Sequence, residues 1–361
     1  MKNIFKKIVL LSIIIITGLV VHNLLNERKT LQALPTSNNE GFAVFNTPDT
    51  EFLQFKKKLD TVPIKIQDFS GDYSLPLKEY CIKGSYNSAI TGKYVSNDMI
   101  KLVLSRGCRF LDLEVLVVDG TPIVSYTKDK AYSSRETENS EVLDTILTTI
   151  ASNAFVASNP NPKDPLFIHI RVKSNDNNSL KYIAASIDNT LAKTKKLYNT
   201  PIDDKTTLQD ILGKFVVIID NTNIYNFNAL TKCSKDENNC YDLNNYISSK
   251  SNSQFFKKNK FIDILESAET VPSLDDNGIS DVKKINIGMP DIIENTGLFS
   301  GSNTENPDIR HLVYKHAIQI SGFKYYLQDE NLSQQEDFFN FFKSAIVPFK
   351  RSMPYLNRYF E

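Results

Sequence analysis

The sequence lacks tryptophan and has no excess of charge of either sign, with 42 lysines and arginines against 42 aspartates and glutamates in 361 residues. Nucleic-acid-binding proteins usually present a basic surface, so the neutral balance gives no reason to expect a nucleic-acid partner. No internal repeat is found, and the length allows one large domain or two small ones. The informative signals are therefore local.

Cysteines are few, and their spacing excludes two common uses. Cys233 and Cys240 flank a polar loop, KCSKDENNC, whose spacing fits neither a zinc ribbon nor a redox CxxC pair. In an oxidising compartment the two can form a local disulfide, and two unpaired thiols are the alternative. Cys81 and Cys108 lie at or near the starts of expected strands, and we expect both to be buried.

The N-terminus contains one long apolar run. Ile8 to Leu25 includes no charged side chain apart from a potential charge on His22, and its eighteen residues are about the minimum for crossing a bilayer core. No small-x-small cleavage site follows it, which favours an uncleaved transmembrane anchor. A cleaved signal peptide or a soluble segment are the alternatives.

The expected topology follows from the flanking charges. Lys2, Lys6 and Lys7 favour a cytoplasmic N-terminus. A single-pass membrane protein would then have its body in the lumen, outside the cell or on a virion surface. Glycosylation sequons at Asn177 and Asn331 fit that placement.

The rest of the chain divides into segments of different composition and periodicity. Residues 1–28 are assigned to the anchor and 29–75 to a polar stalk with a short helix at 52–59. From residue 76 strand-like and helix-like runs alternate, which predicts an α/β domain. The expected strands are 80–83, 110–118, 122–125, 166–172, 215–220 and 317–321, with a closing one at 346–349; the expected helices are 97–105, 141–154, 180–195, 261–269 and 334–345.

Three segments together resemble the X region of the phosphatidylinositol-specific phospholipases C. They are YCIKGSYNSAITG, then SRGCRFLDLEVLVVDGTPIVSYT, then DPLFIHIRVKS, and RGCRFLDLE is the most specific. Two late segments, HAIQISGFKYY and PFKRSMPYLNR, resemble the family's closing strands and also phospholipase-like proteins of large DNA viruses. The resemblance implies a distorted TIM barrel, with an X-region-like part at 76–220, an irregular insertion at 221–310 and a closing segment at 311–361. Its site would lie at the C-terminal ends of the strands.

The resemblance also shows what has changed at the site. The family uses two histidines as general base and general acid, and these positions hold Tyr86 and Tyr126. A tyrosine, with a reference pKa near 10, is a poor base at neutral pH. His169 lies two residues before Arg171 on the same strand face and is the one histidine placed to substitute.

The family's calcium site is altered in the same way. Three of its ligand positions are kept as Asn87, Asp112 and Glu114, but the fourth, a glutamate in the family, is Arg171. A guanidinium there repels a divalent cation and can pair with both carboxylates. We therefore expect no metal and no other cofactor.

These substitutions leave three hypotheses open. The leading one is a catalytically impaired, membrane-anchored pseudoenzyme that binds an inositol phospholipid headgroup or a protein partner. The second is an active phosphodiesterase that uses Arg171 in place of calcium, with Tyr126 or His169 as acid. The third is a structural membrane or virion-surface protein. Whether the chain is an enzyme stays undecided from sequence.

Overall fold

The computed structural model describes residues 47–127, 131–132, 134–222, 224–233, 240–290 and 305–361. The predicted anchor at 8–25 lies outside this part of the chain. Within the described ranges, no helix has the length and apolar character needed to cross a membrane. Residues 46–292 and 304–361 form one compact unit.

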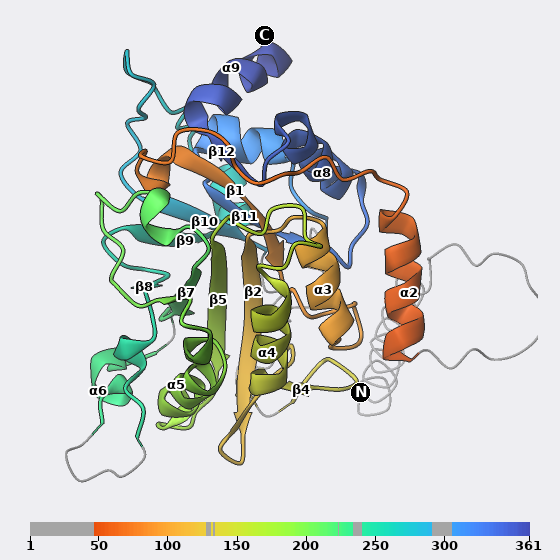
Figure 1. The fold of residues 1–361 in the computed structure, drawn as a ribbon, viewed down its shortest axis with the longest axis vertical. Coiled ribbons are helices and arrows are strands. Elements are labelled where there is room, and N and C mark those ends of the chain that lie inside the picture. Colours follow the sequence, from red (N-terminus) through yellow and green to blue (C-terminus); the bar gives the residue numbers. More distant parts are fainter. Residues whose placement is uncertain (1–46, 128–130, 133, 223, 234–239, 291–304) are drawn as a thin grey trace, which may run out of the picture. The chain divides into compact units, whose positions relative to one another are not determined.

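A mostly parallel sheet forms the centre of this unit, and it curls around a shared interior (Figure 1). Its main strands run in the order β7, β5, β2, β1, β11, β10, β9, with β6 and β8 both paired to β7. No pairing joins β8 to β9 among the described residues, which leaves an open seam. The α/β class and the TIM-like curl are thus confirmed. The strands are β1 (Tyr80–Tyr86), β2 (Phe110–Val118), β5 (Leu166–Lys173), β6 (Leu197–Tyr198), β7 (Phe215–Asp220), β8 (Ser249–Lys250), β9 (Phe256–Lys260), β10 (Ile285–Met289) and β11 (Ile320–Lys324).

Three helices cover the outer face of β2, β5 and β7: α3 (Asn97–Ser105), α4 (Leu143–Asn153) and α5 (Ser179–Asn189) (Figure 1). The predicted bounds of α3 are confirmed, and Ser96 caps it by accepting from the amide of Asp98. The helix predicted from residue 141 begins at 143, because Glu141–Val142 (β4) pairs with β3 (Thr121–Val124). The helix predicted at 180–195 ends at 189.

Inside the curl, the inward side chains change from apolar to polar along each strand. On β2 the succession is Phe110, Asp112, Glu114, and on β5 it is Phe167, His169, Arg171. Alternate residues of a strand share a face, so these polar groups collect at the carboxyl ends of the strands. The arrangement provides an apolar barrel floor and a polar mouth.

The predicted irregular insertion at 221–310 is wrong in part, because it contains three of the parallel strands, the two-residue β8 and the longer β9 and β10. The sequences of β9 and β10, FKKNK and INIGM, are short, and β9 has one apolar residue among three lysines. Neither gives the alternation that identifies a strand. The strand predicted at 317–321 is found at 320–324, since Ala317 adopts a left-handed conformation (φ 50°) that precedes it. The segment also contains α6 (Phe227–Thr231) and α7 (Phe261–Glu266).

The described part of the predicted stalk is folded against the body. Helix α2 (Pro48–Leu59) begins at a Thr47 capping box and buries Phe55 and Leu59. Arg106 donates from Nη1 to the carbonyls of Leu59 and Val62, which fixes the end of α2. The short helix predicted at 52–59 is confirmed and begins earlier, at Pro48; residues 29–46 lie outside the described part.

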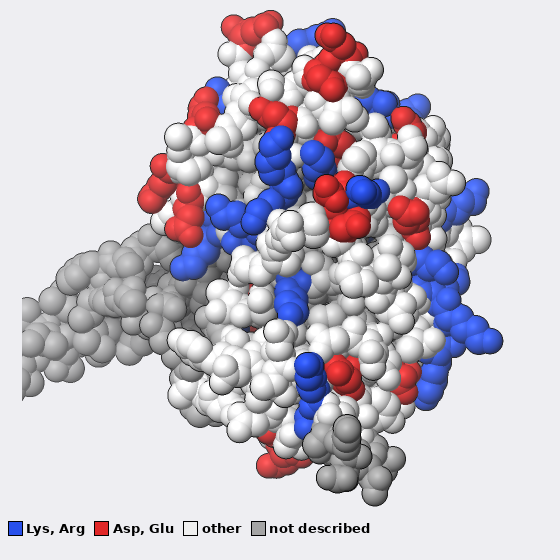
Figure 2. Space-filling model, turned by 90° about the vertical axis from the view of Figure 1, so that its left-hand side faces the viewer, with Lys and Arg blue, Asp and Glu red and all other residues white. Residues whose placement is uncertain are grey.

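The C-terminal segment packs across the strand starts. Helix α8 (Glu330–Phe342) leads to β12 (Ile346–Pro348) and α9 (Phe349–Phe360). β12 pairs antiparallel with the first half of β1, so the predicted closing strand exists but is not a further parallel strand of the barrel. On the face shown in Figure 2, acidic and basic side chains are interspersed.

The structure pairs two of the four cysteines and so decides between the two alternatives. Cys233 and Cys240 form a disulfide with a Cα–Cα distance of 5.7 Å. Cys81 and Cys108 are unpaired and buried.

Candidate active site

Arg171 is the centre of the polar mouth. Its Nε donates to Asp112 Oδ1 at 2.9 Å, its Nη2 donates to Asp112 Oδ2 at 2.9 Å, and its Nη1 donates to Glu114 Oε2. Parallel pairing of β2 with β5 places Asp112 beside His169 and Glu114 beside Arg171, so strand register creates these contacts. All of these side chains are buried.

Asn87 completes the ring of partners. Its Oδ1 accepts from Arg171 Nη2 at 2.6 Å, and its backbone amide donates to Asp112 Oδ2 at 3.0 Å. The residue follows β1 in a left-handed conformation (φ 44°), which asparagine tolerates better than most residues. One guanidinium therefore contacts an amide and two carboxylates.

The electrostatics of the cluster follow from burial and this pairing. Burial alone would raise the pKa of Asp112, but Arg171 and His169 outweigh it and hold that pKa well below its usual range. Burial likewise opposes the charge on Arg171, whereas Asp112 and Glu114 hold its pKa well above the ordinary value. The cluster is thus a fixed internal ion-pair network at any pH near neutrality.

The two tyrosines at the predicted acid–base positions line the same mouth. The Arg171 guanidinium lies over the Tyr86 ring, 4.7 Å from its centroid. Burial raises the pKa of Tyr86 well above its normal value, and burial together with Glu114 raises that of Tyr126 to about 12. The amide of Thr127, next to Tyr126, donates to Glu114 Oε1 at 2.7 Å. Both phenols are therefore protonated at neutral pH.

His169 lies deeper than Arg171, in a hydrogen-bonded chain with two partners. Its Nδ1 is 2.7 Å from Asp112 Oδ1 and its Nε2 is 2.6 Å from Ser251 Oγ. Because a carboxylate only accepts, Nδ1 donates, and Nε2 is left to accept from the serine hydroxyl. The order Asp, His, Ser resembles a nucleophilic triad, but all three side chains are fully buried and Arg171 shares the carboxylate. The geometry fits a positioning chain for Asp112.

Two further strands contribute charge to the mouth. Asp220, at the end of β7, accepts from Lys258 Nζ of β9 at 2.5 Å, and this ion pair spans the β8–β9 seam. Burial would raise the pKa of Asp220, yet Lys258 and His169 bring it to about 2. Lys173 ends β5, two residues beyond Arg171.

Comparison with known proteins decides the family. Residues 73–220 match the family model described as phosphatidylinositol-specific phospholipase C, X domain. Residues 73–220 therefore belong to the X domain family of the phosphatidylinositol-specific phospholipases C. The matched stretch contains all seven predicted site residues, from Tyr86 to Arg171. The comparison with curated proteins gives no match.

Two solved phospholipase C structures share the fold of this chain. PLC21 of L. pealei is 14% identical with a TM-score of 0.54, covering 80% of this chain and 39% of that one. PLC21 of S. officinalis is 16% identical with a TM-score of 0.53, covering 82% and 40%. The chain thus spans about two fifths of these proteins. A calcium-dependent phosphoinositol-specific phospholipase C of Pseudomonas sp. is 9% identical with a TM-score of 0.40, covering 80% and 99%.

Calcium, on which some of these phospholipases C depend, does not fit the residues present here. The three oxygen-bearing side chains that could hold it, Asn87, Asp112 and Glu114, all accept from Arg171. A calcium ion needs six to eight oxygen ligands and would have to occupy the space of the guanidinium. Among the described residues, no group of three or more His, Cys, Asp or Glu side chains is placed to hold a metal.

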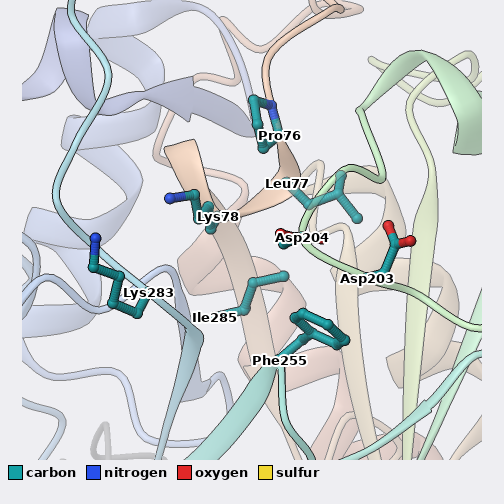
Figure 3. A pocket seen from close by; sticks show the side chains of 8 residues that line it. All are labelled: Pro76, Leu77, Lys78, Asp203, Asp204, Phe255, Lys283 and Ile285. Atoms are coloured by element: carbon teal, nitrogen blue, oxygen red, sulfur yellow. The ribbon is translucent and has the colours of Figure 1, made fainter.

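Two hollows among the described residues lie away from this cluster. One, with about 230 Å³ of space, is at the opposite end of the barrel, where Leu77 and Lys78 precede β1 and Ile285 begins β10 (Figure 3). Another, of about 540 Å³, lies between the end of α2 and the start of α8. Neither is lined by a predicted site residue.

Sequence reasoning missed several members of the mouth. Ser251 and Lys258 come from the segment taken as irregular, and Tyr326 follows β11, whose start was misplaced. The pKa of Tyr326 is raised by burial and by Tyr126, and its hydroxyl interacts with Asn87. Asp220 ends a predicted strand and Lys173 directly follows another, both on the same face as the predicted site residues. The period of two along a strand was therefore the available signal for those two residues.

Proposed function

We propose that this protein is a membrane-anchored phospholipase C-like pseudoenzyme that binds a phosphorylated inositol headgroup without hydrolysing it. One observation carries the proposal: Arg171 occupies the centre of the site and is hydrogen-bonded to Asn87, Asp112 and Glu114. A fixed positive group supplied by the chain itself replaces the need for a metal ion to balance the two buried carboxylates.

Loss of hydrolysis follows from the absence of a base. Tyr86 and Tyr126 hold their protons at neutral pH because burial raises both pKa values. Losing one general acid–base group typically costs about 10²- to 10⁴-fold in rate, and here two are replaced. His169 is sealed between Asp112 and Ser251, with no ring nitrogen free for a substrate. Phenol hydroxyls can still donate hydrogen bonds to a headgroup.

The decisive assay measures hydrolysis and binding on the same preparation. We expect no release of inositol phosphate from phosphatidylinositol vesicles, with calcium or with a chelator, but measurable binding of inositol 1-phosphate by calorimetry. Calcium-independent hydrolysis that is lost in Arg171→Lys would instead support an active phosphodiesterase that uses Arg171. Neither hydrolysis nor binding would support the purely structural membrane or virion-surface protein.

The membrane attachment is a separate part of the proposal. It is supported by the uncharged run of residues 8–25 with lysines before it, and the Cys233–Cys240 disulfide suits an oxidising compartment. We propose a cytoplasmic N-terminus and a lumenal or external body. The protein should resist carbonate extraction, and its body should be protected from protease added to sealed microsomes. Release by carbonate, or digestion of the body in sealed vesicles, would contradict this topology.

A further inference from the structure

The cations of the barrel mouth differ in how they are paired. Arg171 is bound to two carboxylates, and Lys258 pairs with Asp220. Lys173 forms no ion pair with any carboxylate in the described ranges, although it is half-buried at the end of β5. A buried ammonium without a counter-ion is unfavourable, and burial accordingly lowers the pKa of Lys173.

Lys173 lies against a defined group of neighbouring residues. Its Nζ lies 5.5 Å from the centroid of the Tyr132 ring. Tyr132 has a left-handed backbone (φ 57°), which is unusual for a bulky side chain and marks a position maintained by its context. Asn175 Nδ2 donates to the carbonyl of Ala131 at 2.9 Å and so connects the loop after β5 to the Tyr132 segment.

The direction of Lys173 follows from strand geometry. It is two residues beyond Arg171, so both side chains leave the same face of β5, toward the mouth. Arg171 already makes hydrogen bonds through Nε, Nη1 and Nη2, whereas no hydrogen bond of Lys173 Nζ to the described residues is seen. An anion arriving at the mouth would therefore find donors to spare on Lys173.

We infer that Lys173, backed by Tyr132, is the group that receives a phosphoryl oxygen in the barrel mouth. The inference rests on the proposed function and deepens it, because it assigns the anion contact to Lys173 and leaves Arg171 a structural role. The ligand class is a phosphate monoester, either free phosphate or the phosphate of an inositol headgroup.

The test compares a variant that removes the charge of Lys173 with one that keeps it, by calorimetry with inositol 1-phosphate and with inorganic phosphate. Lys173→Met should weaken binding about tenfold or more, as expected for loss of a charge-assisted hydrogen bond. Lys173→Arg keeps the charge and should bind within about threefold of the wild type on the same scale. Lys257→Met, at an exposed outward position on β9, should change nothing. Circular dichroism establishes that each variant is folded.

The outcomes separate this inference from the proposed function. Binding of inositol 1-phosphate that Lys173→Met leaves intact would overturn the role of Lys173 and leave headgroup binding standing. Binding of inorganic phosphate alone, lost in Lys173→Met, would support Lys173 as the phosphoryl contact and contradict headgroup recognition. If the wild type binds neither probe, both the role of Lys173 and the proposed headgroup binding are overturned.

Discussion

Replacing Arg171 by methionine should convert the mouth from a stable ion-pair network into a weak calcium site. The side chain is 3% exposed, while Asp112 and Glu114 are 0% and 1% exposed. Removing one partner of such a buried pair typically costs about 3–5 kcal/mol, because the remaining charge has no compensation. We therefore expect Arg171→Met to lower the free energy of unfolding by about that amount at pH 7.

The pH dependence of the free energy of unfolding should have opposite signs in the wild type and in Arg171→Met, because of the pKa of Asp112. In the wild type the folded-state pKa of Asp112 is lowered, so its stabilisation is present above the unfolded-state pKa and is lost as pH falls through the folded value. Without Arg171, burial dominates and raises that pKa, so the variant loses stability as pH rises. The difference between the two proteins should be largest near pH 7 and should shrink as pH falls to 4, because the variant regains stability while the wild type keeps most of its own, as measured by urea denaturation.

Calcium provides the second readout for the same variant. A unit charge pair at 4 Å is worth about 4 kcal/mol at an effective dielectric near 20, so Arg171 opposes a divalent ion by about 8 kcal/mol. That equals the binding energy of a site with a dissociation constant of about 1 μM. Once Arg171 is removed, calcium at a hundred times its dissociation constant should restore about 2.7 kcal/mol of stability. The wild type should not respond.

A surface pair serves as the control. Arg310 contacts Asp308 at 2.7 Å but is 31% exposed in its side chain, so Arg310→Met should cost about 1 kcal/mol or less. Equal destabilisation of Arg171→Met at both pH values, or a calcium response in the wild type, would refute the electrostatic reasoning.

Three further changes test other parts of the molecule. Arg171→Glu should bind calcium by calorimetry but stay inactive, and only with Tyr86→His and Tyr126→His as well should calcium-dependent hydrolysis of phosphatidylinositol appear. Glu336→Gln should lower the free energy of unfolding by about 3–5 kcal/mol in urea denaturation, since Glu336 is buried and its oxygens contact Lys83 and Arg106; a loss below about 1 kcal/mol would contradict this. Cys240→Ser should cost about 2.5 kcal/mol or less, the loop-closure value for this short loop, and mass spectrometry of the native protein should find the disulfide.

The parts of the fold that sequence predicted well are those where periodicity and apolar character coincide. β7 is a nearly continuous apolar run, and β2 and β5 alternate apolar residues with the buried polar residues of the site. Helix α3 has a clear cap and an apolar stripe. β9 could not be found in this way. Lys258 pairs across the seam and Lys257 and Lys260 are exposed, so the strand has the composition of a surface loop.

The site shows the same contrast between contacts that sequence spacing predicts and contacts that it does not. Placement of Asn87, Asp112, Glu114 and Arg171 needed only strand register and the resemblance, and the structure brings them into direct contact. Ser251 could not be foreseen, because its contact with His169 joins residues 82 positions apart through a pairing of β8 with β7. Non-local contacts of this kind leave no local pattern in the chain.

The acidic residues of the mouth bear on function less directly than their family positions imply. Asp112 and Glu114 are buried, and each needs a positive partner whatever the protein does. In a calcium-dependent enzyme the ion can supply that charge, whereas here Arg171 supplies it from within the chain. Retaining these carboxylates is therefore required for folding once Arg171 is present, and it is no sign of catalysis. The groups that report on function are the two that are only partly buried, Lys173 and the protonated phenol of Tyr126, because these side chains are placed to meet a ligand.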